Sequence, residues 1–189
     1  TSKASIRFTG FTMINILKTQ IYLYSMCNLR IKFKEKHMIN PAIFRAYDIR
    51  GNSNNDLSPE IAYKIGFCFA RIILSSQKEA GSNFICVGRD GRLSSEELCN
   101  ALLQGIRATG ANVKYIGLVA TPTLYFADKI FSAPASIMVT GSHNPKDDNG
   151  FKMVKNNAPF FGLMIQDLRK QIEEFNWPAL EIKDNYVQD

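Results

Sequence analysis

The chain has 189 residues, of which 46% are hydrophobic and 21% are charged, as in an ordinary globular protein. Its net charge of +6 comes entirely from residues 1–37, which carry seven Lys and Arg and one acidic residue, whereas residues 38–189 carry sixteen of each sign. These numbers argue against a basic nucleic-acid-binding face on the globular part. No apolar stretch reaches the roughly 18 residues that a membrane-spanning helix needs, so we expect no membrane partner.

The N-terminal segment 1–37 differs from the rest of the chain. It is basic, carries scattered aromatic residues and shows no sustained periodicity. We interpret it as a non-native or poorly ordered extension, with Met38 as the natural start of the protein. A basic arm that binds nucleic acid is the alternative interpretation. Residues 38–175 would then form one globular domain, and the polar residues 176–189 would form a linker.

Hydrophobic periodicity predicts alternating strands and helices along the globular part. The predicted strands cover residues 43–51, 83–87, 112–117, 135–139 and 151–154. The predicted helices cover residues 59–75, 94–109, 124–131 and 161–175. This alternation predicts a three-layer α/β/α domain with a mixed, mostly parallel sheet.

Helix-capping residues mark the start of two of these helices. Ser58 followed by Pro59 is typical of an N-cap and a first helical position. Ser94 and Glu97 match a capping box, in which each side chain bonds the backbone of the other residue. Both helices are therefore predicted to begin close to these residues.

The four cysteines, Cys27, Cys68, Cys86 and Cys99, form no C-x-x-C pair. Cys68 and Cys86 lie in apolar runs, and Cys99 lies in a predicted helix. This pattern favours buried, reduced thiols over disulfides or metal ligands. Reduced thiols are typical of a cytoplasmic protein, which is the location we expect.

One loop combines a hydroxyl with special backbone residues. The sequence TGSHNP at 140–145 directly follows the apolar strand 135–139. Gly141 can adopt backbone angles that are closed to other residues, and Asn144-Pro145 is a turn dipeptide. Ser142 is therefore expected at the carboxyl end of a buried strand, where α/β proteins place their ligands.

Cationic residues recur near this loop in the sequence, among them His143, Lys146 and Lys152. Arg50, beside a glycine, is either an anion donor in a site or a solvated surface residue. The turn GRDGR at 88–92 precedes a helix and suits either phosphate binding or a structural Arg–Asp pair. No G-x-S-x-G elbow, P-loop or dinucleotide fingerprint is present. A serine among cations suits phosphoryl transfer, in which the serine can carry the phosphoryl group itself.

Five segments resemble motifs of the α-D-phosphohexomutases, and most closely those of the bacterial phosphomannomutase/phosphoglucomutase group. They are FRAYDIRG at 44–51, VGRDGRLS at 87–94, TPT at 121–123, TGSHNP at 140–145 and NGFK at 149–152. The resemblance runs in order over residues 39–175, which is nearly all of the globular part, so chance similarity is implausible.

The resemblance implies that Ser142 is the active-site serine, phosphorylated in the resting enzyme. It would give its phosphoryl group to a glucose or mannose 1- or 6-phosphate and take the other phosphoryl group back from the bound 1,6-bisphosphate. Glucose or mannose 1,6-bisphosphate would thus act as a phosphorylating activator, and Mg²⁺ would bind a phosphate oxygen on Ser142. By position, Lys152 and Arg50 would hold the reacting groups and assist proton transfer. Tyr47 would line the sugar site, and His143 would support the serine loop.

The resemblance covers only the first of the four domains that family members have. The second domain carries a three-aspartate Mg²⁺ loop, the third reads the sugar and the fourth grips its phosphate. The resemblance therefore implies domains II–IV as missing partners, besides the phosphosugar, and residues 176–189 as a linker to the second domain. We expect this chain to be inactive alone, as a truncated chain or gene fragment. The alternative is a non-catalytic phosphosugar-sensing or interaction module that retains the serine loop.

Overall fold

A computed structural model describes residues 39–76 and 83–178 of the chain. The predicted extension at 1–37, the proposed start at Met38 and Cys27 lie outside these residues. Most of the predicted linker, from residue 179 to 189, also lies outside them.

The described part of the chain contains one mixed sheet of six strands. They are β1 (Ile49–Asn52), β2 (Phe84–Arg89), β3 (Asn112–Leu118), β4 (Ala135–Val139), β5 (Asp148–Lys155) and β6 (Ala158–Pro159). The strand order is β1-β5-β4-β2-β3, with β6 paired to β5. Strand β2 is parallel to β3 and β4, whereas β5 is antiparallel to β1, β4 and β6. The predicted mixed sheet is confirmed, with its parallel part formed by β2, β3 and β4.

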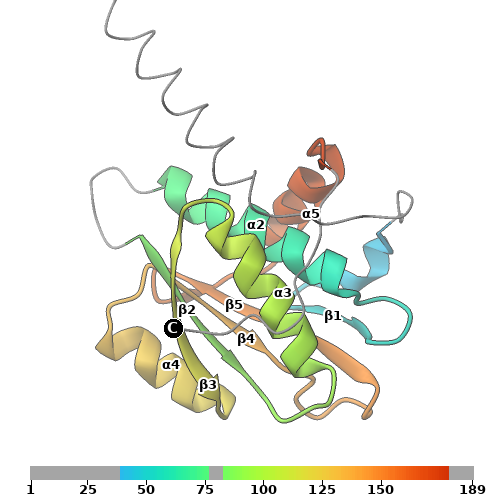
Figure 1. The fold of residues 1–189 in the computed structure, drawn as a ribbon, viewed down its shortest axis with the longest axis horizontal. Helices are drawn as coiled ribbons and strands as arrows, with labels where there is room; N and C mark the ends of the chain where they lie inside the picture. The colour runs from blue at the N-terminus through green and yellow to red at the C-terminus, as the bar shows by residue number, and fades with distance from the viewer. Residues whose placement is uncertain (1–38, 77–82, 179–189) are drawn as a thin grey trace, which may run out of the picture.

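Helices cover both faces of the sheet (Figure 1). They are α2 (Pro59–Ser76), α3 (Ser95–Arg107), α4 (Thr121–Ile130) and α5 (Leu163–Glu174), preceded by a 3-10 helix, η1 (Pro41–Ile43). Helices α2, α3 and α5 contribute to one core, which also receives Ile85 and Ile137 from the sheet. Helix α4 contributes to a second core with Cys86 and Met138, the next residues along the same strands. Because successive strand residues point to opposite faces, these two cores confirm the α/β/α arrangement.

Of the two predicted helix N-caps, the structure confirms one and contradicts the other. Helix α2 begins at Pro59 as predicted, and the Ser58 hydroxyl accepts a hydrogen bond from the Ile61 amide at 3.3 Å. The capping box at Ser94 is wrong, because Ser94 has helical angles and makes no side-chain cap bond. Its hydroxyl instead accepts a hydrogen bond at 2.9 Å from Asn149, which lies 55 residues away.

Two predicted strands also differ from the structure. The segment 43–51 is not one strand, because η1 ends at Ile43 and β1 begins only at Ile49. Asn40 caps η1 by accepting a hydrogen bond from the Ala42 amide at 3.0 Å, and Pro41 supplies the first helical position. Strand β5 begins at Asp148, three residues before the prediction, because pairing with β1 extends it through the predicted turn.

The three cysteines that the structure describes are free and buried, as predicted. Burial raises the pKa of the Cys68 and Cys99 thiols to about 12 and that of Cys86 to about 11. These thiols therefore stay protonated at neutral pH, which makes them poor nucleophiles and poor metal ligands.

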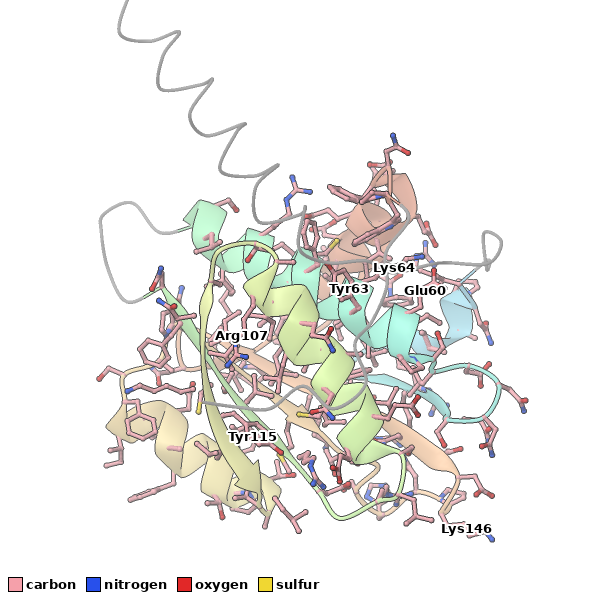
Figure 2. All side chains as sticks on the ribbon, viewed as in Figure 1. Glu60, Tyr63, Lys64, Arg107, Tyr115 and Lys146 are labelled. Atoms are coloured by element: carbon pink, nitrogen blue, oxygen red, sulfur yellow. The ribbon has the colours of Figure 1, made fainter. Side chains whose placement is uncertain are left out.

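The C-terminal end of the described chain packs against α2. The Trp177 ring lies 5.3 Å from that of Phe67 and 6.4 Å from that of Tyr63, between ring centroids. Lys64 is buried, contacts Glu60 and places its ammonium 5.4 Å from the Trp177 ring (Figure 2). Residue 177, which the sequence analysis assigned to the linker, thus belongs to the packed domain.

Within residues 39–76 and 83–178, no helix has the length and the apolar character needed to cross a membrane.

A buried carboxyl on α4 provides a test of the second core. Asp128 is 3% exposed, and its Oδ1 atom has no hydrogen-bond partner in the described part of the chain. Burial raises the pKa of this carboxyl, although Ser136 and Lys129 offset part of the effect. A raised carboxyl pKa means that its contribution to stability is present at acidic pH and is lost as the pH rises through the folded-state pKa.

Replacing Asp128 with Asn is therefore expected to stabilise the chain by about 1 kcal/mol at neutral pH. The gain should vanish in acid, where the wild-type carboxyl is itself protonated. Urea unfolding at neutral and acidic pH measures both values. Asp167→Asn, on the exposed surface of α5, is the control. An Asp128→Asn chain that is less stable than wild type at neutral pH would contradict the expectation.

Candidate active site

Ser142 lies just after β4, at the end of the sheet where the parallel strands finish, and its side chain is exposed. Its backbone φ is +52°, in the left-handed region that non-glycine residues rarely adopt. From the sequence, unusual backbone angles are expected at Gly141. The structure places them on the serine itself, because Gly141 is not among the residues with positive φ.

Gly141 is needed for space rather than for backbone freedom. A Cβ atom at this position would collide with Nε and Cζ of Arg92, and it would lie 2.7 Å from a terminal nitrogen of the same side chain. Real Cβ atoms essentially never come so close to another heavy atom. The guanidinium therefore packs directly against the Gly141 backbone.

The Asp90 carboxylate organises the start of the serine loop. One oxygen accepts hydrogen bonds from the Thr140 hydroxyl at 2.8 Å and the Gly141 amide at 3.1 Å. The other accepts from the Arg92 amide at 3.0 Å and from the Ser95 hydroxyl. Burial by itself raises the pKa of Asp90, but these four hydrogen bonds outweigh it and lower the pKa below its ordinary value. Asp90 is therefore held in its charged form.

Two further contacts fix the loop on either side of Ser142. The Thr140 hydroxyl that donates to Asp90 accepts a hydrogen bond from the Ser142 amide at 2.9 Å. The Asn144 side chain accepts a hydrogen bond at 2.8 Å from Arg50, which also pairs with Asp48 at 2.7 Å. The loop is thus connected to β1 through Arg50 and to the end of β2 through Asp90.

Arg50 is therefore not a solvated surface residue. Its side chain is 19% exposed, and one terminal nitrogen bonds Asn144 while the other bonds Asp48. It lies beside the serine loop, as the resemblance implied.

The two arginines of the GRDGR turn are engaged by protein acceptors. Arg89 donates to the Tyr115 hydroxyl and to Glu96, each at 3.0 Å. Arg92 donates to backbone carbonyls of the serine loop and pairs with Asp90 through Nε at 3.7 Å. Of the two interpretations that the sequence left open, the structure favours the structural Arg–Asp pair over phosphate binding.

The remaining predicted site residues have few protein contacts. The Nδ1 atom of His143 lies 3.4 Å from the Ser142 hydroxyl oxygen, and the His143 ring is exposed. Lys152 is half-buried on β5 opposite Met138, and its side chain makes no hydrogen bond or ion pair with the described residues. Lys146 points away from the sheet at the tip of the loop (Figure 2).

Tyr47 precedes β1, and its side chain is 80% exposed. Its ring stacks on that of Phe161, with centroids 6.2 Å apart. The Gly162 amide donates to the Ala46 carbonyl at 2.7 Å, which holds the two segments together. The two rings therefore form an exposed aromatic surface at the β1 side of the domain.

The described residues do not form a metal site by themselves. No group of three or more His, Cys, Asp and Glu side chains in residues 39–76 and 83–178 is placed to hold a metal ion. Asp90, whose carboxylate is hydrogen-bonded to the loop, already accepts four hydrogen bonds. A phosphate on Ser142 could offer an oxygen ligand, but the other ligands of a Mg²⁺ ion would have to come from elsewhere.

Sequence reasoning did not single out several residues that organise this site. Asp90 appeared only as one member of a charged turn, and Asn144 only as a turn residue. Asn149, which is fully buried, donates to Ser94 and Ser95 at 2.9 Å each and so links β5 to α3. Asn149 stood only at the start of the NGFK motif, and that motif does not indicate a link to residues 54 and 55 positions away.

Comparison with known proteins identifies the family. A family model described as phosphoglucomutase/phosphomannomutase, alpha/beta/alpha domain I, matches residues 41–177. The chain belongs to the phosphoglucomutase/phosphomannomutase family. The predicted resemblance is therefore confirmed, as is its restriction to the first domain of the family.

Individual relatives agree with this assignment. The chain is 45% identical over 133 residues to a phosphomannomutase/phosphoglucomutase of Pseudomonas aeruginosa, which covers 70% of this chain and 28% of the relative. It is 44% identical over 137 residues to a phosphoglucomutase of Neisseria meningitidis, which covers 72% of this chain and 29% of the relative. A crystal structure of a phosphoglucomutase/phosphomannomutase family protein from Burkholderia thailandensis has a TM-score of 0.67 and 41% identity, covering 76% of this chain and 32% of that protein. The chain thus spans less than a third of the length of these relatives.

Proposed function

We propose that this phosphoglucomutase/phosphomannomutase domain carries the phosphoryl group on Ser142 in the interconversion of hexose 6-phosphate and hexose 1-phosphate, with glucose or mannose as the sugar. The observation that carries this proposal is the position of Ser142. Its exposed hydroxyl stands on a left-handed backbone, at the end of the sheet where α/β proteins bind ligands. Family membership supplies the reaction class, and the geometry supports the serine as its donor.

The proposed transfer exchanges one phosphorus–oxygen bond for another. A free sugar hydroxyl attacks the phosphorus of phospho-Ser142, a bond forms to the sugar oxygen, and the bond to the serine oxygen breaks. The proton of the sugar hydroxyl is delivered to the serine oxygen. The reverse step, from the other phosphate of the 1,6-bisphosphate, restores phosphoserine, so the serine splits one transfer into two.

Residues around the serine fit this role by charge and exposure. Lys152 makes no ion pair within the described residues, so its ammonium is available to a phosphoryl oxygen. Arg50 is fixed by Asp48 and Asn144, which preorganises a positive charge beside the loop. His143 contacts the serine oxygen, and Tyr47 offers an exposed ring face to a sugar.

This chain would supply the serine donor only. Because it spans less than a third of its relatives, we propose that domains II–IV of a complete enzyme are partners in turnover. Family members would use Mg²⁺, yet the described residues offer no cluster of ligands for it. We therefore derive no step through the metal from this chain.

Phosphate uptake by the 189-residue chain tests the proposal. Incubation with glucose 1,6-bisphosphate should add one phosphate, measured by intact mass and located on Ser142 by peptide mass spectrometry. Ser142→Ala should abolish the uptake. Ser132→Ala is a matched control, because Ser132 is also exposed and also has a left-handed backbone, with φ of +49°.

The outcomes separate the two functions. Uptake that persists in Ser142→Ala would contradict the assignment of the serine. No uptake by the wild-type chain would favour a non-catalytic module that retains the loop, and binding of hexose phosphate without transfer would then be its expected activity.

A further inference from the structure

The Arg92 side chain reaches across the turn after β2 into the serine loop. One terminal nitrogen donates to the carbonyl of Asp148 at 2.8 Å and to that of Pro145. The other donates to the carbonyls of Ser142 at 3.0 Å and Asn144 at 2.7 Å. One guanidinium therefore binds four backbone carbonyls within residues 142–148, from the serine loop to the first residue of β5.

The four terminal N–H groups of this guanidinium have acceptors. A guanidinium carries two N–H groups on each terminal nitrogen and one on Nε. The four terminal N–H groups match the four loop carbonyls, and Nε faces the Asp90 carboxylate at 3.7 Å. No terminal N–H group remains for a ligand phosphate, and the 16% exposure of the side chain agrees with an internal role.

The guanidinium acts on the backbone conformation of Ser142 in particular. A serine with φ of +52° is in a region that L-residues leave unless their surroundings hold them there. Arg92 binds the carbonyl of that same residue, while Thr140 binds its amide. The two contacts hold both sides of the strained residue and so set the direction of its hydroxyl.

We propose that Arg92 is the positioning residue of Ser142, and that position 141 is glycine because the guanidinium occupies the space of a Cβ atom. The proposal rests on the proposed function in one respect, which is that the Ser142 hydroxyl is the reacting group. Arg92 acts through the loop backbone and contacts no reacting atom.

Hydrogen exchange tests this arrangement independently of chemistry. The loop amides of Asn144 and Asp148 are bonded within the loop, so their exchange reports its opening. In Arg92→Ala we expect the segment 140–150 to exchange at least about tenfold faster than in wild type, from the loss of several charge-assisted hydrogen bonds. Arg89→Ala is the matched control, because Arg89 lies in the same turn but donates to Tyr115 and Glu96 instead.

The link to Gly141 has its own test. Gly141→Ala should displace the guanidinium and accelerate exchange of the segment to a similar extent. The double variant, with Arg92→Ala, should exchange no faster than either single variant, because both changes remove the same contact. Additive effects, or equal exchange in Arg92→Ala and Arg89→Ala, would overturn the proposal.

Phosphate uptake distinguishes positioning from a purely structural role. In Arg92→Ala the initial rate of Ser142 phosphorylation by glucose 1,6-bisphosphate should fall about a hundredfold, as misplacement of a reacting group does, with the final stoichiometry unchanged. Millimolar guanidinium chloride should restore much of the rate, whereas sodium chloride at the same concentration should not. An unchanged rate in Arg92→Ala would overturn the proposal. If the wild-type chain takes up no phosphate, the proposed function is contradicted but the role of Arg92 is not. Hydrogen exchange in Arg92→Ala and Arg89→Ala then decides whether Arg92 holds the loop.

Discussion

Replacing Gly105 with alanine is expected to lower the free energy of unfolding by about 3 kcal/mol, because it forces two helices apart. A Cβ atom at Gly105, on α3, would collide with the carbonyl oxygen of Tyr63 on α2 and lie 3.0 Å from the amide nitrogen of Phe67. These are backbone atoms, so no change of rotamer relieves the overlap. In the same way, a Cβ atom at Gly66, on α2, would collide with the carbonyl oxygen of Leu102 on α3.

The expected sign is the opposite of the intrinsic helix propensity. In an exposed helix interior, glycine to alanine gains about 1 kcal/mol. Here the helix–helix contact decides, because the backbones of α2 and α3 approach each other directly at Gly66 and Gly105 (Figure 1). Thermal unfolding should show that Gly105→Ala melts about 10 °C below wild type.

Gly91→Ala is the control for this prediction. A Cβ at Gly91 would meet only the Leu118 side chain, at 3.8 Å, which is an ordinary contact. This variant should melt close to wild type. If Gly105→Ala were as stable as Gly91→Ala, the close approach of α2 and α3 would be wrong.

Asp90→Asn is expected to destabilise the chain by about 2 kcal/mol at neutral pH and to loosen the serine loop. Asp90 accepts hydrogen bonds from Thr140, Gly141, Ser95 and the Arg92 amide. An amide cannot accept all four, because one of its two polar atoms is a donor. The two donors that face this nitrogen would lose their acceptor.

The pH dependence of this loss has a definite sign. Burial acts to raise the pKa of Asp90, but its hydrogen bonds outweigh burial and the folded-state pKa lies below the ordinary value of 3.8. A carboxyl with a lowered pKa stabilises the fold above its unfolded pKa, and this contribution is lost as the pH falls through the folded-state pKa. The stabilities of wild type and Asp90→Asn should therefore converge in strong acid.

Urea unfolding across the acidic range measures this convergence, and hydrogen exchange of residues 140–150 measures the loop. Asp56→Asn serves for comparison, because a hydrogen bond from Asn40 also lowers the pKa of Asp56 but Asp56 does not touch the serine loop. Faster loop exchange in Asp56→Asn than in Asp90→Asn would argue against Asp90 as the anchor of the loop.

Local sequence signals predicted most of the secondary structure because they act over a few residues. Strand β4 has the predicted bounds, 135–139, since all five of its side chains are buried and apolar or small. Helix α2 begins at Pro59 because Ser58 and Pro59 suit its first turn. The predictions were wrong where a residue distant in the sequence makes a contact. Asn149 donates a hydrogen bond to the Ser94 hydroxyl, which therefore does not cap α3. Pairing with β1 extends β5 back to Asp148.

The candidate site, too, was predicted from the sequence in its local features but not in its long-range contacts. The loop at 140–145 and the exposed serine could be predicted, because glycine, serine and Asn-Pro together indicate a turn after a strand. The partners of that loop could not, because Asp90 lies 50 residues from Thr140 and Arg50 lies 94 residues from Asn144. No periodicity or composition reports contacts at such separations.

The sequence by itself determined the alternation of strands and helices, the position of Ser142 in a turn and, through five motifs in order, the family. Only the tertiary structure decided which residues hold that serine. Positive φ at Ser142 and the absence of a side chain at Gly141 both follow from a guanidinium that arrives from another strand end. Backbone strain and close packing depend on what lies opposite a residue in space, and that neighbour is set by the fold.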